Sequence, residues 1–303
     1  MCFPLSSCPP RPSMTVSGFT FIRNGVYYDY PFLEAIRSIL PLCDELVVAV
    51  GAGQDDTRER IAALGDSRIR ILDTVWDENL REGGRVLAQQ TDLALAEIQG
   101  DWGLYIQGDE VLHEQYQPVV RQAMERYLED GLTEGLLFRY LHFYGSSRWV
   151  GRARQWYRQE VRVVRNLPGI HSWKDAQGFR RDGRKLKVRP IPADMYHYGW
   201  ARHPRAQQRK QEDFNKLWHD DQWIERHVVK ADAYDYRTGA VLRPFSGTHP
   251  QVMAERLAQE DWTFDYTPRH ARPKLKERLT AWIEHYTNWR PGEYRNFQLL
   301  PAD

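Results

Sequence analysis

The chain has 303 residues, with 42 Lys and Arg against 41 Asp and Glu and a formal net charge of +1. This length fits one large α/β domain or one domain with an appendage. The balanced charge argues against a general nucleic-acid or membrane-surface binder. We therefore expect no nucleic-acid partner. No stretch reaches the roughly 18 to 20 apolar residues of a membrane span, so we also expect no transmembrane segment.

The three cysteines, Cys2, Cys8 and Cys43, form an odd and sparse set. Such a set does not make a disulfide framework, and a reducing cytoplasm is the expected compartment. Residues 1–13 contain three prolines between positions 9 and 12 and no apolar core. They are therefore interpreted as a disordered leader or an upstream start before Met14, and not as a signal peptide.

The first hundred residues alternate between strand and helix patterns. Buried or alternating apolar runs predict strands at 16–22, 45–50, 68–72 and 102–106. Apolar residues at helical spacing predict helices at 32–42, 57–64 and 85–98. This alternation predicts an α/β fold with a doubly wound, mostly parallel sheet. Gly51 and Gly53 do not form a dinucleotide fingerprint, because the third glycine is missing at the required spacing.

The pattern changes after residue 110. We expect helices at 118–128, 203–218 and 274–286 and strands at 135–144, 160–165 and within 185–198. The predicted organisation is an α/β domain at residues 14–200, followed by a helical, Trp-rich extension at 201–303 whose role no motif reveals.

One stretch organises the chain: an apolar run, Trp102 to Ile106, followed closely by the acidic pair Asp109 and Glu110. A buried strand there places the carboxylates at its carboxyl end, where open α/β sheets bind ligands. Hard divalent cations take oxygen ligands and neutralise a leaving diphosphate. The alternative is an acidic first turn of a helix, where Asp and Glu are favoured.

Five short motifs in order resemble those of family-2 glycosyltransferases of the GT-A fold, notably bacterial lipopolysaccharide-type sugar transferases. The motifs are Arg23-Asn24-Gly25, residues 51–57, residues 90–95, Gly100-Asp101-Trp102 and Gln107-Gly108-Asp109-Glu110. The resemblance covers residues 15–114 well and extends loosely to 210. It implies an inverting, hexosyltransferase-like enzyme of surface polysaccharide biosynthesis. Such an enzyme uses Mn²⁺ or Mg²⁺ and moves a sugar from a nucleotide-sugar donor to a glycan or lipid-linked acceptor.

The resemblance makes Asp109 the principal metal ligand, with Glu110 supporting the site. His197 is either a further ligand, as related transferases often have, or a histidine packed between tyrosines. Two positions depart from the family pattern. Gln107 stands where the family has its first metal-motif Asp, and Val50 stands where an Asp commonly reads a uracil ring.

The donor site implied by the resemblance draws on several segments. Asp55 and Asp56 also suit helix capping, and Arg202 and Lys210 suit either a diphosphate site or a solvated helix face. The expected donor-binding residues are Asn24, Asp55, Asp56, Asp92, Gln107, Gly108, Asp109, Arg202 and Lys210.

An inverting transferase needs a carboxylate that takes the proton of the acceptor hydroxyl. Asp175 is the predicted base, with Glu160 and Asp182 in reserve; a surface-loop Asp is the alternative interpretation of Asp175. Trp173 is the predicted acceptor-stacking residue, although most tryptophans serve packing. The basic run 180–187 suits an anionic lipid-linked acceptor and peripheral membrane contact, or a solvated turn.

Two other functions stay open. A nucleotidyltransferase shares the sheet and the carboxylate metal site, but would normally carry a basic, glycine-rich phosphate loop after the first strand. The second is a GT-A-fold module that binds a nucleotide or glycan with weak or no catalysis. Gln107 and Val50 keep this alternative open.

Overall fold

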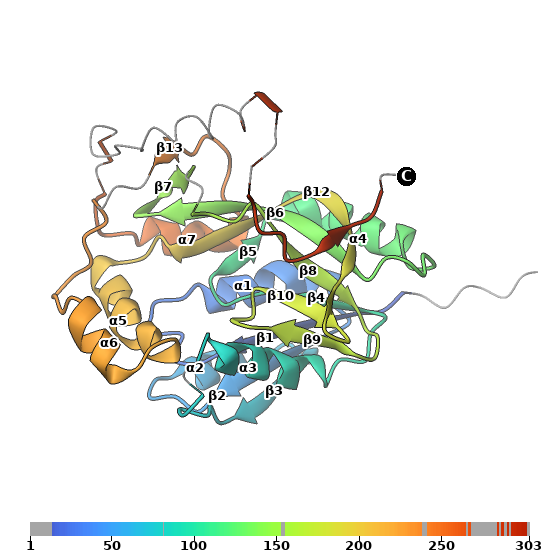
Figure 1. The fold of residues 1–303 in the computed structure, drawn as a ribbon, viewed down its shortest axis with the longest axis horizontal. Helices are drawn as coiled ribbons and strands as arrows, with labels where there is room; N and C mark the ends of the chain where they lie inside the picture. Colours follow the sequence, from blue (N-terminus) through green and yellow to red (C-terminus); the bar gives the residue numbers. More distant parts are fainter. Residues whose placement is uncertain are drawn as a thin grey trace, which may run out of the picture.

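The computed structural model describes residues 14–80, 82–152, 155–237, 241–264, 266–267, 284, 286–287, 290 and 292–301. Its main sheet begins with four parallel strands in the order β4-β1-β2-β3 (Figure 1). These strands are β1 (Val16–Ile22), β2 (Glu45–Gly51), β3 (Ile69–Thr74) and β4 (Trp102–Tyr105).

The sheet continues beyond β4 with mixed pairing. β8 (Gln159–Arg165) runs antiparallel to both β4 and β6 (Gly135–Tyr144), and β7 (Ser146–Gly151) and β13 (Leu242–Pro244) follow β6. The long strand β12 (Lys187–Trp200) lies parallel to β6 and also pairs with β5 (Glu110–Leu112) and β14 (Gln298–Leu299). A small second sheet contains β9 (Ile170–Trp173), β10 (Gly178–Arg181) and β11 (Arg184–Lys185).

Helices cover both faces of the parallel strands. In β2, Val48 packs into the cluster that contains α1 (Phe32–Ile39) and α4 (Gln117–Arg126), whereas Val47 packs into the cluster with the end of α3 (Arg85–Leu95). Successive side chains of a strand point to opposite faces, so a continuous apolar run needs cover on both. The predicted α/β class, with helices on both faces, is confirmed.

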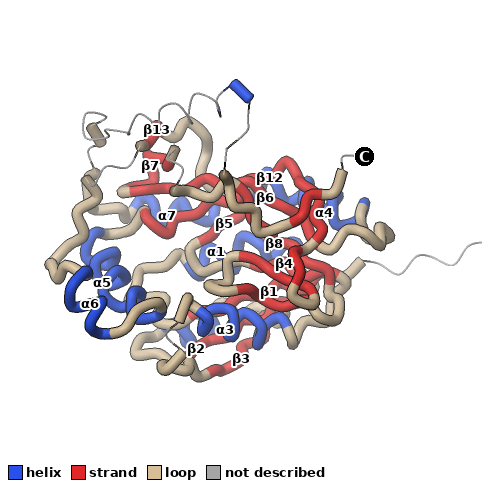
Figure 2. Tube along the Cα trace, viewed as in Figure 1, coloured by secondary structure: helices blue, strands red, loops and turns tan. Residues whose placement is uncertain are grey.

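The other helices include α5 (Pro204–Phe214), which is as long as α3 at 11 residues, and several shorter ones. The shorter ones are α2 (Thr57–Ala62), α6 (Asp221–His227), α7 (Ala254–Ala258) and the 3₁₀ turns at Leu40–Leu42, Glu114–Tyr116, Asn215–Leu217 and Gln251–Met253. Figure 2 shows α5 and α6 together at one end of the molecule and α4 near the other. No helix among the described residues is long and apolar enough to cross a membrane.

Most expected elements lie within a few residues of their predicted bounds. Glu110 opens the buried strand β5, so the alternative interpretation of the acidic pair as the first turn of a helix is wrong. The elements that were not predicted are the strands β5, β7, β9, β10, β11, β13 and β14 and the helices α6 and α7. Residues 201–303 contain α5, α6 and α7, but also β13 and β14, which join the main sheet. The leader 1–13 and most of the helix expected at 274–286 lie outside the described residues.

A buried ion pair joins the start of β5 to β8. Glu110 and Arg162 are both fully buried, and Arg162 donates from Nε and Nη2 to the two carboxylate oxygens at 2.8 and 2.7 Å. The Tyr140 hydroxyl donates to the same carboxylate at 2.7 Å. Two charges withdrawn from water are stable only when their hydrogen bonds are satisfied, and here they are.

We expect Arg162→Met to lower the free energy of unfolding by about 3–5 kcal/mol, because it leaves the Glu110 carboxylate buried without its cation. Urea denaturation measures this loss. Arg121→Met, which removes the exposed pair between Arg121 and Glu125 on α4, is the control and should cost less than about 1 kcal/mol. Equal losses in the two variants would show that the buried pair contributes no more to the free energy of unfolding than the exposed pair does.

Candidate active site

A cavity of about 900 Å³ lies at the carboxyl ends of β1 and β4. It is bounded by the loop after β2, the start of α3 and the α5 region. The turn after β4 is closed by the Glu110 amide, which donates to the Gln107 carbonyl at 3.0 Å. Of the residues predicted from the sequence, those that line the cavity are Asn24, Asp55, Gln107, Gly108, Asp109, Asp175, His197 and Lys210.

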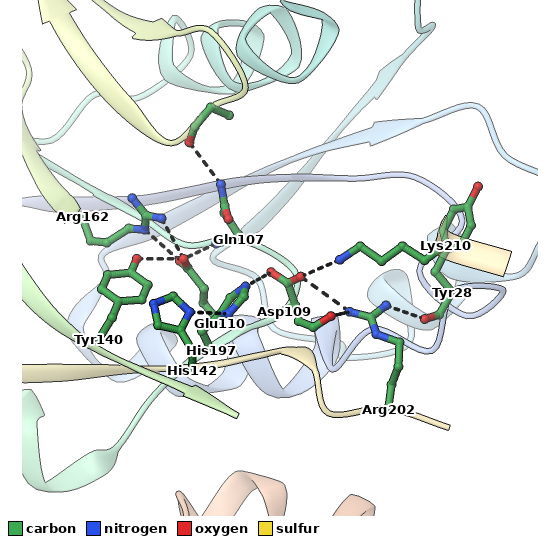
Figure 3. Close-up of polar contacts among 12 residues, drawn as sticks. Tyr28, Gln107, Asp109, Glu110, Tyr140, His142, Arg162, His197, Arg202 and Lys210 are labelled. Carbon is green, nitrogen blue, oxygen red and sulfur yellow. Dashed lines mark hydrogen bonds and ion pairs between the residues drawn. The ribbon is translucent and has the colours of Figure 1, made fainter. Parts of the chain in front are cut away.

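Asp109 is the electrostatic centre of this cavity. Its Oδ2 accepts a hydrogen bond from Lys210 Nζ at 3.2 Å and lies 3.6 Å from Arg202 Nη2 (Figure 3). Burial alone would raise the pKa of Asp109, but Lys210, His197 and Arg202 outweigh it and hold this pKa well below its usual range. Burial and Arg202 lower the pKa of Lys210 to about 8. At neutral pH the carboxylate is ionised and Lys210 is mostly charged.

His197 lies beside Asp109 as a neutral ring. Its Nε2 is 3.7 Å from Asp109 Oδ1, and burial lowers its pKa to about 4. A Cβ on Gly199 would lie 2.5 Å from His197 Nε2 and 2.8 Å from Asp109 Oδ2. Glycine therefore keeps the space beside these two atoms open. An anionic oxygen and a neutral imidazole nitrogen are suitable donors for Mn²⁺, so the residues fit a divalent cation.

Few such donors lie close together in the part of the chain that the structure describes. No group of three or more His, Cys, Asp or Glu residues that could hold a metal occurs in the described part of the chain. Glu110, the other carboxylate of the motif, is turned away from the cavity into its pair with Arg162. A cation at Asp109 and His197 would thus need further oxygens from a ligand or from water.

Arg202 is buried, and two of its three guanidinium nitrogens make hydrogen bonds, whereas its Nε has no hydrogen-bond partner. Its Nη1 donates to the Tyr28 carbonyl at 2.7 Å, its Nη2 donates to the Gly199 carbonyl at 3.0 Å, and its guanidinium lies over the Tyr30 ring. It does not line the cavity. Arg202 thus joins the loop after β1 to the end of β12 and adds positive charge behind Asp109.

Asn24 and Asp55 connect the loops after β1 and β2. Asn24 Oδ1 accepts from the Gln54 amide at 2.8 Å, and Asp55 Oδ2 accepts from the Tyr27 amide at 2.7 Å. Both residues line the cavity while holding its wall together. Asp56, by contrast, pairs with Arg60 on the exposed side of α2 and lies outside the cavity lining.

Asp175 lies in a strained turn between β9 and β10. Its neighbours Lys174 and Ala176 have φ values of 55° and 61°, a left-handed region that residues with a Cβ rarely adopt. Burial raises the pKa of Asp175. Strain of this kind persists only where surrounding contacts fix it, and it gathers at functional sites. The turn presents a carboxylate of increased basicity to the cavity.

Gln107 anchors this turn to the acidic motif. Its Nε2 donates to the Ala176 carbonyl at 3.1 Å (Figure 3). Arg162 Nη1 donates to the Gln177 carbonyl at 3.1 Å. An ionised Asp or Glu at position 107 only accepts hydrogen bonds and could not donate to the Ala176 carbonyl. The departure from the family pattern therefore has a structural role.

Besides Arg202 and Asp56, three further predicted site residues lie outside the cavity lining. Asp92 Oδ1 accepts from the Ser172 amide at 2.6 Å and joins α3 to β9. Glu160 is buried, and this burial raises its pKa to about 8. Trp173 has the Arg180 guanidinium over its ring at 4.9 Å. In the basic run, Arg181 and Arg184 are both paired with Glu134, which neutralises part of its charge.

Sequence reasoning missed Gly199 and His142. Gly199 directly follows the predicted strand that ends in Tyr198, and a glycine at a strand end next to a suspected ligand was the available signal. His142 lies within the strand pattern of β6, and nothing in the sequence distinguishes it from a packed core histidine.

No protein-family model matches the chain, and no curated protein sequence matches it. Among solved structures, the chain is similar in part to glucosyl-3-phosphoglycerate synthase from Mycobacterium tuberculosis, crystallised with Mn²⁺, UDP and glucosyl-3-phosphoglycerate. That match has 21% identity over 44% of this chain and 46% of the synthase, with a TM-score of 0.31. S. aureus TarS matches with 15% identity over 89% of this chain and 48% of TarS, with a TM-score of 0.40. The chain spans less than half the length of either protein.

We expect Gln107→Glu to loosen the turn at 174–177, because a carboxylate cannot donate to the Ala176 carbonyl. Loss of one hydrogen bond of about 1.4 kcal/mol should speed amide exchange there about tenfold. Hydrogen–deuterium exchange with mass spectrometry measures the peptides that cover the turn. Gln122→Glu, on the exposed side of α4, is the control, and equal protection in both variants would contradict the anchoring role.

We expect Glu160→Gln to gain stability relative to the wild type as pH rises from about 4.5 to about 8. Burial favours the neutral carboxyl of Glu160. In the wild type, the contribution of this carboxyl to folding stability is complete below about pH 4.5 and is lost as the pH rises through the pKa of the folded state. The difference should grow by a few kcal/mol, at about 1.4 kcal/mol per pKa unit as an upper limit. Urea denaturation at several pH values tests this, with Glu125→Gln on α4 as control. A pH-independent difference would contradict it.

Proposed function

We propose that this protein is a metal-dependent, inverting glycosyltransferase that moves a sugar from a nucleotide-sugar donor to a glycan or lipid-linked acceptor in polysaccharide biosynthesis. The observation that carries the proposal is Asp109, an ionised carboxylate at the carboxyl end of a central parallel strand. It lies in a large cavity beside a neutral histidine and a lysine. Cavities at this edge of α/β sheets are common ligand sites.

In this proposal Asp109 and His197 hold Mn²⁺ or Mg²⁺. The bound ion supplies positive charge to the leaving nucleotide diphosphate. Lys210, charged at neutral pH and with a side chain 13% exposed, is placed to contact the same diphosphate. Asn24 and Asp55 keep the loops after β1 and β2 in position around the nucleotide.

Asp175 is the proposed general base. As the acceptor hydroxyl oxygen bonds to the anomeric carbon, the bond from that carbon to the diphosphate oxygen breaks, and the hydroxyl proton passes to Asp175. A single displacement of this kind inverts the anomeric configuration. The raised pKa of Asp175 suits a base that must hold the proton after transfer. Gln107 and Arg162 keep its turn in place.

One observation favours the second candidate, a nucleotide- or glycan-binding module without catalysis. Asp109 and His197 are only a pair, and the described residues contain no group of three or more His, Cys, Asp or Glu that could hold a metal. Most metal sites provide more protein donors. The two candidates make different demands on Asp175, since a binding module has no use for a base.

We expect one nucleoside diphosphate of a panel to raise the melting temperature of the wild type only when Mn²⁺ is present. Binding to the native state alone stabilises it by about 2.7 kcal/mol at 100 times Kd. Asp109→Asn should abolish this shift and Asp56→Asn should preserve it. No shift with any nucleotide, in folded protein, would contradict donor binding.

Turnover separates the two candidates. Asp175→Asn should keep the nucleotide-dependent shift but slow sugar transfer, or donor hydrolysis, by about 10²- to 10⁴-fold, the usual contribution of a general base. Binding without any turnover in the wild type would favour the non-catalytic module.

A further inference from the structure

Two buried histidines meet on neighbouring strands beside Asp109. His142 of β6 and His197 of β12 are paired in register, and their Nδ1 atoms are 3.0 Å apart (Figure 3). The His142 side chain is not part of the cavity lining. It can therefore act on a ligand only through cavity-lining residues that it contacts, such as His197.

The proton positions of this pair follow from one fixed acceptor. His142 Nε2 is 2.7 Å from the Tyr157 carbonyl oxygen. A carbonyl only accepts hydrogen bonds, so Nε2 of His142 carries a proton. The His142 ring is buried, and neither of its ring nitrogens is hydrogen-bonded to a carboxylate, so a charged ring would lack a paired anion. The ring is neutral, and its Nδ1 is a bare acceptor.

The same reasoning extends to His197. Because His142 Nδ1 can only accept, His197 Nδ1 must donate across the 3.0 Å contact. Asp109, the carboxylate beside His197, already faces the cations Lys210 and Arg202, so a second proton on the buried His197 ring is unfavourable and its Nε2 carries a lone pair. That atom lies 3.7 Å from Asp109 Oδ1, too far for a hydrogen bond but next to the second proposed ligand.

We propose that His142 is a positioning residue that fixes the tautomer and ring orientation of His197, so that the bare Nε2 of His197 faces Asp109 and is available to a divalent cation. The metal part of this inference rests on the proposed function. The tautomer part stands on the hydrogen bonds from Tyr157 through His142 to His197.

Packing makes His142 a rigid support. Its ring stacks on Tyr140 and Trp156 with interplanar angles of 26° in both cases, and the Tyr157 ring meets it edge-on at 89°. A ring held on several sides cannot turn to offer its other nitrogen. Partners of this kind around a metal-binding histidine fix its tautomer and are worth about 10- to 100-fold in metal affinity.

Without His142, the His197 proton has a better position. A buried Nδ1–H with no acceptor is unfavourable. Moving the proton to Nε2 places it toward the Asp109 carboxylate, where it occupies the lone pair that a cation would need. The expected defect is therefore a change of tautomer, which a merely space-filling role of His142 would not produce.

Nitrogen-15 NMR of histidine-labelled, metal-free, full-length protein reports this tautomer directly, with His197→Gln used to assign the signals. In the wild type we expect His197 to carry its proton on Nδ1. His142→Asn places an amide oxygen near the position of Nδ1 and should keep this tautomer. His142→Leu removes the acceptor and should move the proton to Nε2. His142→Gln keeps a donor for the Tyr157 carbonyl without an acceptor for His197, and decides the matter if the leucine variant does not fold.

Mn²⁺ titration followed by electron paramagnetic resonance supplies the second readout. The leucine and glutamine variants should bind Mn²⁺ about 10- to 100-fold more weakly than the asparagine variant. A wild-type His197 protonated on Nε2, or leucine and glutamine variants with unchanged tautomer and Mn²⁺ affinity, would overturn the inference. If the wild type binds no Mn²⁺, the metal site of the proposed function fails, whereas the NMR result still decides the role of His142.

Discussion

The arrangement of the whole site depends on the buried ion pair between Glu110 and Arg162. Glu110 follows Asp109 directly, so fixing the first carboxylate in β5 determines where the second one projects. Arg162 also donates to the Gln177 carbonyl, two residues from Asp175. One guanidinium thus holds the acidic motif and the turn of the proposed base in a common frame. Its burial is tolerable because both oxygens of Glu110 are satisfied.

A second constraint is the charge balance around Asp109. One carboxylate faces Lys210 and Arg202, and the adjacent His197 is neutral, so the described charges at this point sum to a positive value. A divalent cation alone would increase that excess, whereas a nucleotide diphosphate would reverse it. In the proposed function, metal and nucleotide are therefore expected to bind together, because each offsets the charge that disfavours the other.

The sequence predicts what local periodicity determines. The apolar run of β2 and the abrupt end of β4 at an acidic pair identify the parallel sheet and the edge where Asp109 lies. Local sequence does not predict the partner of Glu110. Arg162 is 52 residues away along the chain, and it reaches Glu110 only because β8 pairs antiparallel with its neighbours. The three-residue strand β5 is likewise held by β12, far along the chain. Lys210 illustrates the same limit. The charged pattern of its helix predicts a solvent-exposed side chain, whereas in the fold its ammonium lies over the rings of Tyr30 and Phe214.

Gln107 shows how a departure from a family pattern can carry information. Read as a lost metal ligand, it weakens the case for a transferase. In the fold its amide nitrogen instead holds the Ala176 carbonyl, a contact that an ionised carboxylate cannot make. The acidic motif then contributes one cavity-facing carboxylate and one anchor for the turn that carries Asp175. In the proposed function, a metal would have few protein donors and would depend strongly on the orientation of each. The support that His142 gives to His197 would therefore matter more here than in a site with three carboxylates.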